Sequence, residues 1–139
     1  MGEESIAENM DLLIKEYAKN PNGYYQLEEY NASQHEGNFI CWDDITVYLK
    51  IENERIKEFS YDGNCSSITL AAASFVAEMI PNQPLDEVLQ RNYQTLVDQG
   101  FVVSPRRRRA AVISLLWIRN AIYQYRNETT RATFEDLLD

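Results

Sequence analysis

Ile45-Thr46-Val47-Tyr48-Leu49-Lys50-Ile51 is the stretch that decides the fold class. Aliphatic residues alternate along it with Thr, Tyr and Lys, which predicts a strand with one face in a core and one face in water. Glu52-Asn53-Glu54-Arg55 follows as a turn. Residues 56–61 are then expected to return as the second strand of an antiparallel hairpin.

Helical patterns lie on both sides of this hairpin. Residues 4–18 carry one apolar stripe, and Asn20-Pro21-Asn22-Gly23 ends that helix. Residues 24–40 are rich in aromatic residues and irregular, with a short strand expected near Tyr24 to Leu27. After the hairpin, the Ala-rich segment Ser66 to Ile80 predicts a tightly packed helix that stops at Pro81.

The last third of the chain predicts several further helices. A short helix opens at Pro84, and a second short one ends at Gly100 as its C-cap. Ser104-Pro105 starts a long helix over about residues 105–126, and a mini-helix from Thr130 is expected to dock back or to bind a partner. The order of elements predicts an α+β fold with helices packed on one face of a small antiparallel sheet.

Composition limits the classes of function. The chain has 139 residues, 45% of them apolar, which suits a single domain over residues 1–139 with a tail at 128–139. A net charge of −9 argues against nucleic acid and anionic membranes as partners, and it would steer in a basic protein. The acidic start predicts no signal peptide, and two cysteines are too few for a disulfide framework. We therefore expect a cytoplasmic protein.

Five motifs occur in an order that resembles one family. They are Glu16–Pro21 (EYAKNP), Cys41–Ile51 (CWDDITVYLKI), Ile56–Glu58, Tyr61–Ser74 (YDGNCSSITLAAAS) and Pro105–Ala111 (PRRRRAA). In this order they resemble the IscU/SufU/NifU-type scaffolds of iron–sulfur cluster assembly, over roughly residues 5–125. The resemblance implies about three antiparallel strands packed with helices. It also implies a cargo of iron–sulfur cluster or zinc, and sulfur supplied by a cysteine desulfurase.

The resemblance assigns ligands residue by residue. Cys41 matches the first cysteine of the family, which makes it the candidate sulfur acceptor, and Asp43 matches the aspartate of the cluster site. The second cysteine position falls on Ser66, with Cys65 one residue earlier, so either residue is left open as the one that faces the site. The third cysteine position is Ala110. Cys41, Asp43 and Cys65 are thus the candidate cofactor and metal ligands.

Several interpretations remain open beside this one. SufE-type sulfur acceptors share the fold and use one reactive cysteine, and Leu96–Arg109 resembles their corresponding region equally well. The missing third cysteine favours a non-catalytic regulatory or interaction protein that keeps the scaffold fold and a desulfurase-docking surface. An unrelated α+β binding domain is a third alternative, and homo-oligomerisation is left open. The sequence contains none of the common enzyme motifs, so we expect no enzymatic activity.

The residues themselves give a chemical rationale. Thiolate is the species that binds soft metals and accepts sulfur, and a helix start beside Cys65 favours the anion. Buried cysteines often serve only as small hydrophobic residues, which is the structural alternative for both thiols. His35 is the one candidate for a fourth ligand. The run Arg106–Arg109 opposes the helix dipole and is expected to pair with the chain's own carboxylates or to face the Cys41 region, with Arg109 as an electrostatic helper.

Overall fold

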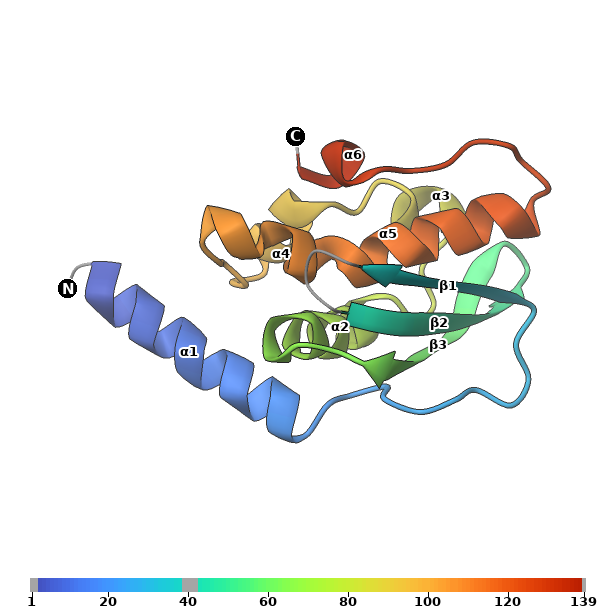
Figure 1. Ribbon diagram of the computed structural model, residues 1–139. Helices are drawn as coiled ribbons and strands as arrows, with labels where there is room; N and C mark the ends of the chain where they lie inside the picture. Colours follow the sequence, from blue (N-terminus) through green and yellow to red (C-terminus); the bar gives the residue numbers. More distant parts are fainter. Residues whose placement is uncertain (1–2, 39–42, 139) are drawn as a thin grey trace.

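A computed structural model describes residues 3–38 and 43–138. Three consecutive strands form one antiparallel sheet in the order β1-β2-β3, and helices pack against it (Figure 1). The elements in chain order are α1 (Glu3–Lys19), β1 (Ala32–Asn38), β2 (Asp43–Glu52), β3 (Arg55–Asn64), α2 (Ser67–Met79), α3 (Leu85–Val88), α4 (Tyr93–Asp98), the 3₁₀ turn η1 (Pro105–Arg107), α5 (Arg108–Tyr125) and α6 (Phe134–Leu138). The predicted α+β class, small sheet and flanking helices are confirmed.

The predicted hairpin is β2 and β3, joined by a tight turn. Asn53 and Glu54 have φ of 54° and 59°. Positive φ at both central residues is what a two-residue type I′ hairpin turn requires, and this turn matches the right-handed twist of the strands. Ile45, Val47, Leu49 and Ile51 face the core and are at most 3% exposed, as their alternation predicts. The other face is less open than expected, because Tyr30 packs on Tyr48 with ring centroids 5.1 Å apart.

The first strand is where the sequence-based prediction is wrong. The strand expected near Tyr24 to Leu27 is absent, and Tyr24 makes only an isolated bridge with Tyr61. The strand is instead β1, seven residues with the sequence ASQHEGN. β1 is an edge strand with few apolar residues, so no alternation marks it, and its pairing with β2 alone defines it.

The core lies between the sheet and two helices that run along it. α2 and α5 pack on each other, and α5 also covers β1 and β2. Figure 1 shows both helices starting at the same end of the sheet, the end where β1 finishes and β2 begins. α1 packs against α2 through an edge-to-face contact of Tyr17 with Phe75, at 5.8 Å between centroids. None of the helices in the described ranges is long and apolar enough to cross a membrane.

The C-terminal segment packs back on α5. For the mini-helix from Thr130, the sequence left open docking back or binding a partner, and the structure shows docking. Leu137 of α6 is 1% exposed. The Asn120 side chain accepts a hydrogen bond from the Ala132 amide at 2.7 Å and donates one to the Ala132 carbonyl at 3.4 Å. This pair of bonds fixes the segment before α6 against the long helix.

Candidate functional site

Strand register brings the start of β2 and the end of β3 together at one end of the sheet. Asn38, the last residue of β1, pairs with Asp43, the first residue of β2. Asp44 in turn pairs with Asn64, the last residue of β3. Cys65 follows Asn64 directly, so the start of β2 and the junction of β3 with α2 are neighbours. We call this edge, from Asn38 through Asp44 to Cys65, the cysteine end of the sheet.

Cys65 lies one residue outside the N-cap of α2. Ser66 is the N-cap, and its hydroxyl accepts a hydrogen bond from the Thr69 amide at 3.3 Å. Cys65 is half-buried, and its Sγ lies 3.8 Å from the Gly63 carbonyl oxygen. The predicted helix start beside Cys65 is therefore confirmed. Because the Ser66 hydroxyl caps the helix, Cys65 supplies the thiol beside the positive end of α2.

Gly63 makes the close approach of β3 to β2 possible. Its φ is +116°, and a Cβ built on it would lie 1.9 Å from the Asp44 carbonyl oxygen. No side chain fits there without moving the backbone. The glycine of the Tyr61–Ser74 motif thus sets the distance between the two strand ends that meet at the cysteine end.

Tyr61 supports the cysteine end from within the core. Its hydroxyl donates to the Asn22 carbonyl oxygen at 2.7 Å, and the Asn22 amide donates to Ser74 Oγ at 2.7 Å. Burial raises the pKa of Tyr61, a hydrogen bond with Ser74 opposes the shift, and the charge of Cys65 adds to it. Tyr61 therefore remains a neutral donor at physiological pH and ties the turn after α1 to α2 and β3.

His35 and Asp44 form a contact on the surface of the sheet that the sequence alone did not predict. His35 lies in β1 and not in a loop as expected, and its Nε2 contacts Asp44 Oδ1. Their side chains are 59% and 57% exposed. The carboxylate that the structure describes at the cysteine end is thus Asp44. Sequence reasoning favoured Asp43 because only that residue matches the Cys-x-Asp motif.

Two of the predicted ligands fall partly or wholly outside the described residues. Cys41 lies in the segment between β1 and β2 that the structure does not describe, and for Asp43 only the backbone in β2 is described. Within the described ranges, no three His, Cys, Asp or Glu side chains come together as a metal-binding group. Ala110 is 6% exposed in the first turn of α5, and its methyl group cannot be a ligand.

The four arginines lie where η1 passes into α5. Arg108 lies over the Tyr93 ring at 5.1 Å from its centroid, and Arg109 lies over the Phe134 ring at 5.3 Å. The ion pairs of the described side chains involve other cations, so the expected pairing of these arginines with the chain's carboxylates is not found there. The described contact of Arg109 is with an aromatic ring of α6.

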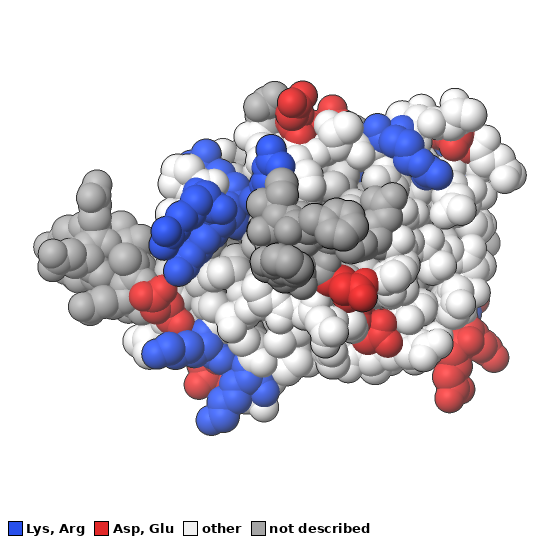
Figure 2. Space-filling model, viewed as in Figure 1, with Lys and Arg blue, Asp and Glu red and all other residues white. Residues whose placement is uncertain are grey.

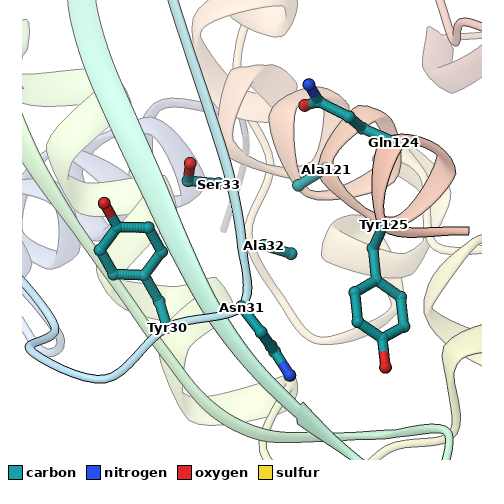
Figure 3. Close-up of a pocket in the computed structure, with 7 residues that line it drawn as sticks. All are labelled: Tyr30, Asn31, Ala32, Ser33, Ala121, Gln124 and Tyr125. Atoms are coloured by element: carbon teal, nitrogen blue, oxygen red, sulfur yellow. The ribbon is translucent and has the colours of Figure 1, made fainter. Parts of the chain in front are cut away.

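A cavity of about 350 Å³ lies away from the cysteine end, between the start of β1 and the end of α5 (Figure 3). It is lined by Tyr30, Asn31, Ala32, Ser33, Ala121, Gln124 and Tyr125. None of these residues is a thiol, carboxylate, imidazole or amine. The lining has no reactive group, so the cavity contributes no chemistry to the candidate site.

The fold and the cysteine end define a class of small α+β domain. Its members have a three-stranded antiparallel sheet and a thiol where the last strand meets the start of a helix. The model of the NifU-like N terminal domain matches residues 10–132. That match covers most of the chain, so the chain belongs to this family.

Curated relatives agree with this family. The iron-sulfur cluster assembly scaffold protein IscU of Thermotoga maritima is 29% identical over 75 residues, which cover 54% of this chain and 53% of the relative. The match therefore spans about half the length of that relative. The scaffold protein IscU 1 of Archaeoglobus fulgidus is 20% identical over 112 residues, or 81% of this chain and 73% of the relative.

Solved structures with the same fold include the N-terminal part of a nitrogen-fixing NifU-like protein from Brucella abortus. It has a TM-score of 0.71 and 19% identity, and the alignment covers 89% of this chain and 99% of that one. A putative scaffold protein for the SUF system from Fervidobacterium islandicum has a TM-score of 0.70 and 16% identity, with 79% and 93% covered. At these identities the likeness supports the fold.

Proposed function

We propose that this chain is an iron–sulfur cluster assembly protein of scaffold type, which carries sulfur or a metal ion at the cysteine end of its sheet. Membership in the NifU-like N terminal domain family supports this function, and so do relatives that are named as cluster assembly scaffolds. In this proposal the protein is cytoplasmic, is a single domain and is not an enzyme. Its sulfur donor is a cysteine desulfurase.

The observation that carries the proposal is the register at the cysteine end. Cys41 precedes Asp43 by two residues, and two residues of chain span at most about 7 Å. Asp44 pairs with Asn64 across one strand spacing, about 5 Å, and Cys65 is the next residue. The Cys41 thiol, the Asp43 carboxylate and the Cys65 thiol are therefore proposed to meet at this edge.

The proposed donor set suits transient cargo better than a permanent metal site. Zinc and iron–sulfur clusters prefer four protein ligands, whereas two thiols and one carboxylate make three. With Ala110 at the third cysteine position, a bound metal or cluster needs an outside ligand. Sulfur carriage needs only Cys41. Its thiolate attacks the outer sulfur of the desulfurase persulfide, the new S–S bond forms as the old one breaks, and the desulfurase cysteine leaves as thiolate.

Ala110 also favours the rival function. A protein that kept the fold for docking or regulation, and lost the metal chemistry, would show a buried methyl group in place of the third thiol. In that case neither cysteine should take up sulfur, iron or zinc.

Anaerobic purification separates the two functions. Wild type should gain one sulfur atom by mass spectrometry after incubation with a cysteine desulfurase and cysteine. Cys41→Ser should lose this gain, Cys65→Ser should lose iron or zinc binding, and Asp98→Asn, an exposed carboxylate of α4, should change neither. If wild type takes up no persulfide sulfur, iron or zinc, the carrier function is refuted and the regulatory one stands.

Ala110→Cys is the complementary variant, because it supplies the thiol that the family position lacks. Restoring a third thiol should raise the amount of zinc or iron that copurifies under anaerobic conditions. A variant that folds like wild type but binds no more metal would show that the start of α5 does not face the cysteine end.

A further inference from the structure

We propose that the surface formed by Arg106–Arg109, here named the arginine surface, is a docking site for an acidic segment of a partner protein. Figure 2 shows Lys and Arg side chains gathered over the end of the molecule where η1 and α5 begin. The argument uses charge, helix position and aromatic contacts. It does not depend on whether the cysteine end carries sulfur or metal.

The first observation is a local excess of charge. Four of the thirteen basic residues of an acidic chain stand in succession. Among the described side chains, Lys50, Lys57, Arg91 and Arg126 all form ion pairs with carboxylates. Within the part of the chain that the structure describes, no ion pair involves the arginine surface. Four adjacent cations in an otherwise acidic chain leave a local positive field for an outside anion.

The second observation is the position of these cations on the helix. α5 has no acidic residue in its first turn, although carboxylates are the residues that stabilise a helix start. Cations there oppose the dipole and reduce the stability of the free protein. An acidic segment bound over this turn would relieve the repulsion, so the helix end and the guanidinium groups favour the same ligand charge.

The third observation is that aromatic rings hold two of the arginines in place. The Tyr93 hydroxyl donates to the Val103 carbonyl oxygen at 3.1 Å and accepts from the Val103 amide at 3.0 Å, which fixes the ring beneath Arg108. Arg109 rests on Phe134 of α6. These two guanidinium groups are thus held in place before a partner arrives, so ordering them costs little side-chain entropy on binding.

The chemistry of the partner follows from these observations. Guanidinium groups bind carboxylates in a bidentate geometry, and the exposed Arg106 and half-buried Arg107 are available for it. Nucleic acid is disfavoured because the rest of the chain is acidic and repels a long polyanion. A short run of Asp and Glu on a protein fits the size of the surface and avoids that repulsion.

The test is binding of a fluorescein-labelled hexaglutamate peptide, followed by fluorescence anisotropy. Wild type should bind, and the affinity should fall as salt rises from about 0.05 to about 0.3 M. The double variant Arg106→Gln/Arg107→Gln should bind at least about tenfold more weakly. Lys15→Gln/Lys19→Gln removes the same charge from two exposed lysines of α1 and should weaken binding less than about twofold.

Each alternative outcome overturns the proposal. Equal losses in the two double variants would mean that net charge alone governs binding, and no binding by folded wild type would remove the site. Tighter binding of a single-stranded RNA of equal charge would identify a nucleic-acid surface. Self-association of wild type that the arginine variant abolishes in sedimentation would identify a second copy of this chain as the occupant. Circular dichroism of each variant checks that the fold is retained.

Discussion

The two ends of the sheet differ in how their arginines are paired. At the hairpin end, Arg126 of α5's C-cap reaches both Asp86 at 3.0 Å and Glu54 at 3.5 Å. The loop after α2 closes the same end, because the Ile56 amide donates to the Gln83 carbonyl oxygen at 3.0 Å. At the other end, where Figure 1 shows α2 and α5 beginning, the arginine surface has no ion pair among the described residues.

We interpret the hairpin end as the part of the sheet whose charges stabilise the fold, and the arginine surface as a part that is suited to binding. Where charges are neutralised inside the protein, they fix the elements that carry them. Where several cations stand together at a positive helix end, the free protein is less stable and an external anion can supply the opposite charge. Variants at the two ends should therefore differ in the size and sign of their effects.

The largest effect is expected for Gly63→Ala at the cysteine end. The new Cβ would collide with the Asp44 carbonyl oxygen, and φ is positive, so we expect a loss of about 3 kcal/mol in the free energy of unfolding. Gly100→Ala is the matched control, because its φ is also positive but nothing lies within 4 Å of the added Cβ. It should cost only about 1 kcal/mol in urea titrations. Equal costs would mean that β2 and β3 do not approach closely at Gly63.

A smaller effect is expected for Tyr61→Phe, which removes the hydrogen bond to Asn22. The cost should be about 1 kcal/mol at neutral pH. Because the pKa of Tyr61 is raised in the folded state, its contribution is complete below pH of about 10 and declines as pH rises above that. Wild type should therefore lose more stability than Tyr61→Phe between pH of about 10 and 12.

Tyr125→Phe serves as the control for this pH series, because Tyr125 is 40% exposed. Thermal unfolding at each pH should give the same curve for Tyr125→Phe and wild type. Identical pH profiles for wild type and Tyr61→Phe would contradict the assignment of the buried hydroxyl as the neutral donor.

Substitutions of the arginines should change the free energy of unfolding least. The sign of the change should differ between the two ends of the sheet. Arg126→Gln should destabilise by about 0.5 to 1 kcal/mol, because its two partners are exposed and screened by water. Arg107→Gln should instead leave stability unchanged or raise it by a few tenths of a kcal/mol, since it removes a cation from a positive helix end. Both can be measured by urea unfolding at low salt. A loss for Arg107→Gln as large as that for Arg126→Gln would show that the two ends do not differ.

Local sequence signals predicted most of the elements. The β2–β3 hairpin, the end of α1 before Asn20 and the start of α2 beside Cys65 all lie where period, turn residues and capping residues indicated. β1 was missed because its pattern is polar, and its strand conformation comes from pairing with β2. The resemblance drew attention to Cys41, Asp43 and Cys65. It gave no signal for Asp44, which lies beside the matched motif residue and contacts His35 across the strands.

The sequence by itself determined the hairpin, the helices, the family and the absence of a thiol at position 110. These features depend on residue type and on spacings of a few residues, which local backbone preferences translate directly into structure. Only the tertiary structure decided that Gly63 lets β3 approach Asp44, that β1 adds an edge strand and that two arginines rest on rings of α4 and α6. Each of these joins residues far apart in the chain, and packing of the whole domain selects such contacts.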